Sequence, residues 1–455
     1  MTKSEKIINI KEILEKLYLE QDFLKEYYST NCNKRNVEEL KNCISQTLHN
    51  LVKRTGISYK ETSYFFKRLS LIISENIVNR ELGGIPYVLS PFYLSIEFSH
   101  PVLAVVFGTF QNFFRGVIWA MALDSLEYFY KTGNRVDIIG FHHEWVSKNM
   151  ESKNVICHCS GYMVETALKL PVKPDYLLIL GLPLNVEHKL HKELSSRASK
   201  HNIKVLNPYV SAKRADNKLL THLILDKEIP MPNYVYINRR ENLRSIKEEV
   251  KEILRSSGKV VVKPVTGTEG IGVKSFVNID ETLEWIQKIR KKDDVLVEEA
   301  RGNLTYRGRS FTIRIVVSFT GKGFEIEGGF AQVASKGNII TSTTHGGEIY
   351  NINKVLQEVL GEKEYERFLS MLKSYCNKVG YTINKYLEED QYLKYMGLDL
   401  VLEKKGNNVT PILLEINSRP SGLTYLRTLT SSGLGESNVI KNLLKYVYSN
   451  FFSKI

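Results

Sequence analysis

A short apolar run that ends in polar residues, at positions 411–422, constrains the fold of this chain more than any other segment. Its sequence is Pro-Ile-Leu-Leu-Glu-Ile-Asn-Ser-Arg-Pro-Ser-Gly, which puts Glu415 and Asn417 two places apart at the end of the run. Residues two apart in a β-strand point to the same face of the sheet. We therefore expect a strand whose end presents the Glu415 and Asn417 oxygens side by side.

A second apolar run, at 397–403, predicts the partner strand. Asp399 is its one carboxylate flanked by apolar residues, and the linker 404–409 has the glycine and asparagine chemistry of a hairpin loop. The hairpin would join Asp399 to Glu415 and Asn417 in an oxygen-only cluster. Such a cluster suits Mg²⁺, which takes one or two carboxylates together with phosphate oxygens. A hairpin whose polar residues simply face water fits the same pattern.

A glycine-rich loop follows a β-branched run within 259–277. The run ends close to Lys263, and the loop carries Gly267, Gly270 and Gly272. Glycine permits positive φ and close approach of the backbone, so successive N–H groups can point at an anion. No Gly-Lys-Ser/Thr opens a helix here, and a strand follows the loop, so neither a Walker loop nor a dinucleotide fingerprint is indicated. Lys263 is placed to reach nucleotide phosphates; an ordinary glycine-rich hairpin is the alternative.

Two acids end a further predicted strand at 294–300. Glu298 and Glu299 follow the run Val-Leu-Val. Such a pair can offer a carboxylate to ribose hydroxyls, while the neighbouring backbone pairs with an adenine edge. Charged pairs are also common at solvated strand ends, so this segment indicates a nucleotide site only in combination with the other segments.

The order and spacing of these elements resemble the ATP-grasp superfamily. The elements that carry the resemblance are Lys218, Lys263 with its glycine loop, Glu298-Glu299, Arg314, Asp399 and Glu415-X-Asn417. The resemblance covers roughly residues 205–445. It implies an α+β and α/β protein with an ATP-grasp fold, in which two α+β lobes clamp ATP. It also implies a ligase that activates a carboxylate as an acylphosphate, which an amine then attacks, with ADP and phosphate as products.

The resemblance also implies the binding residues. Those expected to bind ATP are Lys218, Lys263, Gly267, Gly270, Gly272, Glu298 and Glu299. Those expected to hold Mg²⁺, with Mn²⁺ as an alternative ion, are Asp399, Glu415 and Asn417. The two lysines would contact the α- and β-phosphates, and the two glutamates would lie at the adenine and ribose.

Two arginines are the expected catalytic residues. Arg314 lies in a segment where many members carry Asp-X-Arg, but Thr312 replaces the Asp here, so this carboxylate is absent from the chain. Arg314 would face the γ-phosphate or the acylphosphate. Arg419 opens an Arg-Pro-Ser-Gly turn that resembles turns of carboxylate–amine ligases. It would steady the tetrahedral oxyanion or the substrate carboxylate, or else pair with a surface acid.

Two smaller motifs leave alternatives open. His345, in the polar segment 341–347, either contacts substrate or is solvated. Cys157-His158-Cys159 resembles part of a metal site but has no second Cys/His pair at zinc spacing, which favours a structural role.

Composition limits the partners and the location. The chain is 43% hydrophobic and 25% charged, as expected of a soluble protein. Its net charge of +13 favours anionic partners, such as ATP and an acidic carrier protein or peptide; the lysines are scattered, so nucleic acid is not expected. Five cysteines fit a reducing cytosol. Without a signal-peptide core or an apolar span of about 20 residues, we expect a cytoplasmic protein that does not enter a membrane.

Three domains are predicted along the chain. Residues 1–86 show helical spacing and no chemistry, which indicates a helical extension for dimerisation or partner docking. Residues 87–215 alternate short apolar strands with helical patterns, and this small parallel sheet resembles a pre-ATP-grasp domain. Within it, 142–144 (His-His-Glu) follow a strand end and either line a substrate pocket or form a solvated turn. Residues 216–455 form the ATP-grasp domain.

The resemblance favours an amino-acid or peptide ligase, including one that loads a carrier protein. The first alternative is a ligase that modifies a protein or peptide tail, similar to tubulin tyrosine ligases. The second is a non-catalytic nucleotide-binding regulatory protein, for which Thr312 is the only support. The expected substrates are a small-molecule carboxylate and a small-molecule amine, with a peptide or an acidic carrier protein as the alternative acceptor. The sequence is also compatible with a homo-oligomer.

Overall fold

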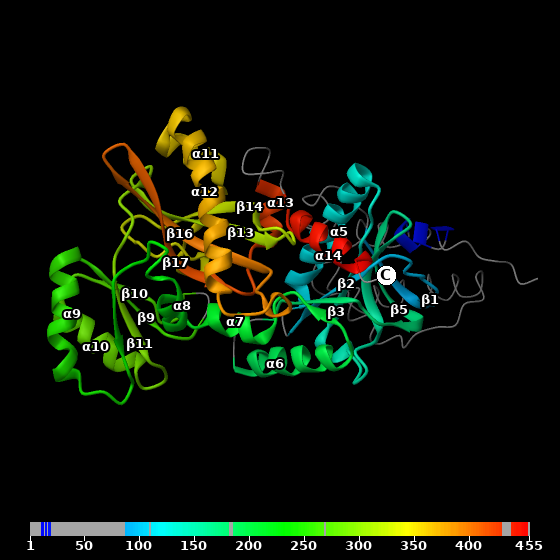
Figure 1. Ribbon diagram of the computed structural model, residues 1–455, viewed down its shortest axis with the longest axis horizontal. Coiled ribbons are helices and arrows are strands. Elements are labelled where there is room, and N and C mark those ends of the chain that lie inside the picture. The colour runs from blue at the N-terminus through cyan, green and yellow to red at the C-terminus, as the bar shows by residue number, and fades with distance from the viewer. Residues whose placement is uncertain are drawn as a thin grey trace, which may run out of the picture. The chain divides into compact units, whose positions relative to one another are not determined.

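The computed structural model describes residues 11–12, 14–15, 17–19, 87–108, 111–181, 185–267, 270–429 and 438–453. They fall into two compact units (Figure 1). The first ends at Leu177 and includes His201–Ile203; the second comprises Leu178–Lys200 and the chain from Lys204 onward. Apart from a few residues within 11–19, the predicted helical segment 1–86 lies outside the described residues.

The first unit is built on a mixed sheet whose strands follow the order β1-β5-β4-β3-β2. The strands are β1 (Tyr87–Leu94), β2 (Val102–Phe107), β3 (Asp137–His142), β4 (Ser152–Cys159) and β5 (Tyr162–Val172). The pairs β2–β3 and β1–β5 are parallel, whereas β4 is antiparallel to both of its neighbours. All six residues of β2 are buried, as expected of a strand covered on both faces.

Helix α5 (Gln111–Thr132) packs against β3 and β4 in this unit. Gly140 of β3 lies under the helix, where a Cβ atom would stand 2.8 Å from Cγ1 of Ile118. A side chain at position 140 would therefore hold the helix away from the sheet. The short helix η1 (His143–Trp145) follows β3, and strand β6 (Tyr176–Ile179) crosses from the first unit into the second.

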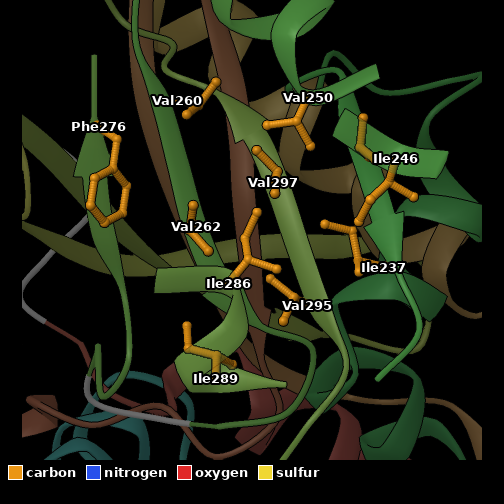
Figure 2. Packing of buried hydrophobic residues seen from close by; sticks show 11 residues of the cluster. Ile237, Ile246, Val250, Val260, Val262, Phe276, Ile286, Ile289, Val295 and Val297 are labelled. Atoms are coloured by element: carbon orange, nitrogen blue, oxygen red, sulfur yellow. The ribbon is translucent and has the colours of Figure 1, made fainter. Parts of the chain in front are cut away.

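A four-stranded antiparallel sheet of order β10-β9-β11-β8 forms one part of the second unit. Its elements are β8 (Tyr234–Ile237), α9 (Leu243–Ser257), β9 (Val260–Pro264), β10 (Lys274–Phe276), α10 (Ile279–Ile289) and β11 (Val295–Glu299). Both helices pack on one face, where alternate strand residues meet them (Figure 2). The residues Val260, Val262, Val295 and Val297 point to this apolar core. By the two-residue period, Lys263 and Glu298 lie on the opposite face.

A six-stranded sheet of order β15-β14-β13-β16-β17, with β12 beside β13, forms the other part. Its strands are β12 (Thr305–Tyr306), β13 (Arg309–Phe319), β14 (Phe324–Val333), β15 (Glu348–Asn351), β16 (Tyr395–Lys405) and β17 (Asn408–Asn417). The predicted hairpin of 397–403 with 411–417 is confirmed, because β16 and β17 pair in antiparallel register from Gly397–Asn417 to Lys405–Asn408.

Helices and short elements complete the second unit. They are α6 (Asn185–Lys200), β7 (Lys204–Val205), α7 (Tyr209–Asp216), α8 (Lys218–Leu225), η2 (Thr343–His345), α11 (Ile352–Leu360), α12 (Glu362–Ile383), η3 (Glu389–Gln391), α13 (Leu423–Leu429) and α14 (Lys441–Phe452). Helix α12 packs on β14, where Gly380 faces the Phe324 ring at a distance that leaves no room for a Cβ atom. In the part of the chain that the structure describes, no helix is long and apolar enough to cross a membrane.

Candidate active site

The large sheet places four functional side chains in one row. The register sets Phe330 of β14 opposite Arg314 of β13, Arg314 opposite Asp399 of β16, and Asp399 opposite Glu415 of β17. Directly opposed residues in antiparallel strands lie on the same face and interact. Asn417, two residues beyond Glu415, shares this face. The structure thus brings Arg314, Asp399, Glu415 and Asn417 together from segments that are far apart in the sequence.

A β-bulge at Leu414 shapes the end of the row. Asp399 pairs with Glu415, but the next residue, Leu400, pairs with Leu413, so Leu414 is the extra residue of β17. A bulge bends its strand and re-aims the neighbouring groups. Here the Leu414 carbonyl accepts a hydrogen bond of 3.3 Å from Nζ of Lys263. The bulge therefore links the acid-bearing hairpin to the glycine-loop lysine.

Arg314 is held in a fixed orientation by three contacts. Its Nε and Nη2 donate to the two carboxylate oxygens of Asp399 at 2.7 and 2.6 Å, and Nη1 donates to Oγ of Ser421 at 2.9 Å. Bidentate arginine–carboxylate pairs are strong and directional. The guanidinium also lies 5.9 Å from the centre of the Phe330 ring. Burial lowers the pKa of Arg314, but Asp399 outweighs it and the net direction is upward, so the side chain stays charged.

Glu415 lies among cations. Nζ of Lys218 is 3.7 Å from its Oε2. Burial raises the pKa of the Glu415 carboxyl, but Lys218 and Lys263 outweigh burial and lower the pKa to about 2. Burial has the opposite net effect at Asp399, whose pKa is raised although Arg314 opposes the rise. Two carboxylates side by side compete for charge, and a bound cation would relieve that competition.

The donor set fits a hard divalent cation. Within the described ranges, no group of three or more His, Cys, Asp or Glu side chains is placed to hold a metal ion, so the candidate site depends on two carboxylates and an amide. Asp399 and Glu415 supply two carboxylates, and the Asn417 amide lies beside them, with Nδ2 donating to Asp399 at 3.2 Å. Oxygen and nitrogen of an amide are interchangeable by rotation, so Asn417 can also present its oxygen. This set suits Mg²⁺, which completes its shell with phosphate and water oxygens.

Lys263 and Glu298 form a buried pair on the far face of the small sheet. Nζ of Lys263 lies 2.6 Å from Oε1 of Glu298, and Nε2 of His222 lies 2.7 Å from the same oxygen. All three residues are at most 5% exposed. Glu299 does not join this pair. Its carboxylate accepts a hydrogen bond from the backbone N–H of Asn233 and forms an ion pair with Arg301.

Ionised Glu298 should make folding stability depend on pH. Burial raises the pKa of Glu298, but Lys263 and His222 together hold it below its usual value. Because the folded pKa lies below the unfolded value of about 4.3, the charge stabilises the fold above that pH and the contribution is lost as pH falls through the folded pKa. We expect Glu298→Gln to be less stable than wild type near pH 7, with a gap in unfolding free energy that narrows in acid. Urea unfolding at a series of pH values measures this; a gap independent of pH would contradict it.

Lys218 reaches the same region from helix α8. Asn217 caps the helix by accepting from the Leu220 backbone N–H at 3.0 Å, which fixes Lys218 as the first helical residue. Its Nζ donates to the Gly267 carbonyl at 3.0 Å and faces Glu415. Lys218 and Lys263 therefore approach Glu415 from different elements.

The glycines of the loop adopt the backbone that the sequence predicts. Gly267, Gly270 and Gly272 have φ of 140°, 72° and 80°, a region that side chains rarely permit. The Gly270 carbonyl lies 3.2 Å from Nε2 of His345, so the structure places this histidine against the glycine loop. Thr312 shares a hydrogen bond of 2.7 Å with Thr341.

Arg419, in the turn after β17, is buried. Its side chain is 2% exposed; Nη2 donates to Asp216, and Nη1 donates to Nδ1 of His191 at 3.0 Å. Ser418 donates to the same aspartate at 2.7 Å. Burial and the neighbouring Arg419 lower the pKa of His191 to about 3, so this imidazole is neutral and accepts at Nδ1. In this arrangement Arg419 anchors the turn after β17 to helices α6 and α7.

The His-His-Glu motif at 142–144 and the Cys-His-Cys motif at 157–159 lie in the first unit. His142 is buried, with Nδ1 3.5 Å from the exposed carboxylate of Glu144. Cys157 is buried on β4 and Cys159 is partly buried there, both as free thiols whose pKa burial raises.

Three residues of the site were not found from the sequence. Ser421 and Phe330 touch Arg314 through turn geometry and sheet register, which no local pattern reveals. His222 had a usable signal: it follows Lys218 by four residues in a predicted helix, and residues four apart share a helix face.

Part of the chain matches a known protein family. Residues 272–449 match the family described as YheC/D like ATP-grasp. No curated protein matches the sequence significantly.

Solved structures with a similar fold include D-alanyl-alanine synthetase A from Vibrio cholerae, with 13% identity, a TM-score of 0.49 and coverage of 78% of this chain and 100% of that one. VanG D-Ala:D-Ser ligase from Enterococcus faecalis has 15% identity, a TM-score of 0.48 and coverage of 77% of this chain and 100% of that one. D-alanine-D-alanine ligase from Coxiella burnetii has 14% identity, a TM-score of 0.49 and coverage of 78% of this chain and 96% of that one. At these identities and TM-scores, the similarities say nothing about substrate. By the family match, residues 272–449 of the chain belong to a YheC/D-like ATP-grasp domain.

Proposed function

We propose that this protein joins a carboxylate to an amine through an acylphosphate, with ADP and phosphate as products. The observation that carries the proposal is the cluster of Arg314, Asp399 and Glu415 on one sheet face, approached by Lys218 and Lys263. Cations and oxygen ligands meet there, as transfer of a phosphoryl group requires.

The chemistry needs charge neutralisation more than a nucleophilic side chain. A carboxylate oxygen attacks the γ-phosphorus, the bond to the bridging oxygen breaks, and ADP leaves. The amine nitrogen then attacks the acyl carbon, phosphate leaves with the former carboxylate oxygen, and the amine proton passes to water. Negative charge grows on the phosphoryl oxygens in the first step, and fixed donors stabilise it without reorganisation.

Each cation of the site has a proposed role. Lys218 and Lys263 bind the α- and β-phosphates, beside the backbone of Gly267, Gly270 and Gly272. Arg314 faces the transferred group. Asp399, Glu415 and Asn417 would hold Mg²⁺, which would neutralise charge on the phosphates.

Two glutamates and a second arginine also have proposed roles. Glu298 and Glu299 are proposed to lie near the adenine and ribose, because both end β11, the strand next to β9. Arg419 acts by anchoring the turn after Asn417, since its guanidinium is buried among Asp216 and His191.

The substrates we propose are an amino acid or peptide on the carboxylate side and an amine that is a small molecule, a peptide or an acidic carrier protein. The net charge of +13 favours such an acidic acceptor. We retain the division into 1–86, 87–215 and 216–455 and a cytoplasmic location as proposals.

Isotope transfer tests the acylphosphate route. With a carboxylate substrate labelled with ¹⁸O, we expect one label in inorganic phosphate, because the oxygen that bridges acyl carbon and phosphorus comes from the substrate. Substrates are first found by screening amino acids, singly and in pairs, with and without carrier proteins, for ADP release. Mass spectrometry of phosphate gives the result, with unlabelled carboxylate as the control. Formation of AMP, or phosphate without label, would reject the route.

A further inference from the structure

We propose that His222 is a positioning residue for nucleotide binding, which acts through Glu298 to hold the Lys263 ammonium toward the phosphates. The inference rests on the proposed function of Lys263. His222 itself is not proposed to contact phosphate or metal. Its effect passes through one carboxylate oxygen.

Two donors converge on that oxygen. Oε1 of Glu298 lies 2.7 Å from Nε2 of His222 and 2.6 Å from Nζ of Lys263. Glu298 is 3% exposed and His222 is 1% exposed. Charge-assisted hydrogen bonds of this length are strong, and burial keeps water from competing for them. The carboxylate is therefore fixed from one side by the imidazole and from the other by the ammonium.

The imidazole has a defined tautomer. An ionised carboxylate only accepts hydrogen bonds, so Nε2 of His222 carries the hydrogen. Nδ1 is buried and, in the described part of the chain, has no hydrogen-bond partner. The ring lies against Tyr234, with centroids 4.3 Å apart. The His222 ring is thus held by packing against Tyr234 on one side and by the hydrogen bond of Nε2 to Glu298 on the other.

Among the residues that the structure describes, the ammonium of Lys263 has two acceptors, which leaves one hydrogen for a ligand. An ammonium has three donors. Glu298 takes one, and the carbonyl of the bulged Leu414 takes another at 3.3 Å. These two acceptors fix the direction of the third N–H bond.

Loss of His222 should therefore weaken nucleotide binding only while Lys263 is present. Without the hydrogen bond from His222, the Glu298 carboxylate can rotate, and the Lys263 ammonium is then no longer held in one direction. A lysine with more freedom loses more entropy when it binds phosphate. A side chain that only fills space would weaken binding to the same extent with or without Lys263.

A double-mutant cycle separates these cases. Calorimetry would measure the affinity of Mg-ADP for wild type, His222→Met, Lys263→Met and the double variant. We expect His222→Met to weaken binding about tenfold in the wild-type background and less than about twofold in the Lys263→Met background. His222→Gln, whose amide can donate near the position of Nε2, should restore most of the affinity. His201→Met is the matched control and should bind as wild type does.

Additive losses in the cycle would overturn the proposal, as would a His222→Gln variant no better than His222→Met. If His222→Met does not fold, Glu298→Asp replaces it, since a shorter side chain cannot reach both partners; additivity with Lys263→Met would again reject the coupling. Failure of wild type to bind Mg-ADP would instead reject the proposed nucleotide site, so the two failures are distinguishable.

Discussion

Glu415→Ala is expected to lower the rate of ADP formation by about a thousandfold or more while the protein stays folded. Glu415 supplies one of the two carboxylates in the predicted metal cluster and faces both site lysines. Its removal leaves one carboxylate, Asp399, which already makes a bidentate pair with Arg314. A single paired carboxylate is a poor site for a divalent cation.

The fold should survive this change. Lys218 keeps its hydrogen bond to the Gly267 carbonyl, and Lys263 keeps Glu298. The measurements are ADP release, thermal unfolding and Mn²⁺ binding in the presence of ADP. Glu325→Ala, an exposed acid on β14 that pairs with Lys445, is the matched control and should change none of them. A folded Glu415→Ala protein that forms ADP at the wild-type rate would remove the metal assignment.

The sequence predicted the hairpin of this site because the information is local there. Alternation puts Glu415 and Asn417 on one face, and the turn residues between the two runs limit the register. The loop glycines were likewise predictable, since each occupies a positive φ that other residues avoid.

Contacts set by tertiary structure were not predictable. Arg314 and Asp399 pair because β13 and β16 are neighbours in the sheet, although 85 positions separate them in the sequence. A single sequence does not reveal which strands become neighbours. Ser421, in the turn after Asn417, accepts a hydrogen bond from Arg314 although 107 positions separate them in the sequence.

Burial also changed the expected surroundings of two charged residues. Glu298 ends an apolar strand, a position that is compatible with solvent, yet it is enclosed by Lys263 and His222. Arg419 opens a polar turn but is covered by helices α6 and α7. Local polarity predicts exposure, whereas a buried charge needs a partner whose position depends on the whole fold.

Arg314→Lys is expected to lower kcat by about a hundredfold with little loss of stability. Lysine keeps the positive charge beside Asp399, so the buried carboxylate is not left unpaired. It cannot reproduce the planar fork that reaches both Asp399 oxygens and Ser421 at once. The charge would remain, but its direction toward the transferred phosphoryl group would be lost.

Variants of Arg314 and Ser421 can separate the effect of the positive charge from the effect of its orientation. Arg314→Lys, Arg314→Met and Ser421→Ala would be compared by ADP release and by urea unfolding. Arg314→Met should also destabilise the fold by about 3–5 kcal/mol, because it leaves Asp399 as an unpaired buried charge. Ser421→Ala removes one hydrogen bond and should reduce kcat less than about tenfold. Arg309→Lys, on the same strand with its partner Glu348 at the surface, is the matched control and should leave kcat unchanged. Near-wild-type turnover by Arg314→Lys would mean that charge alone suffices at this position, and the bidentate geometry would then serve the sheet rather than the reaction.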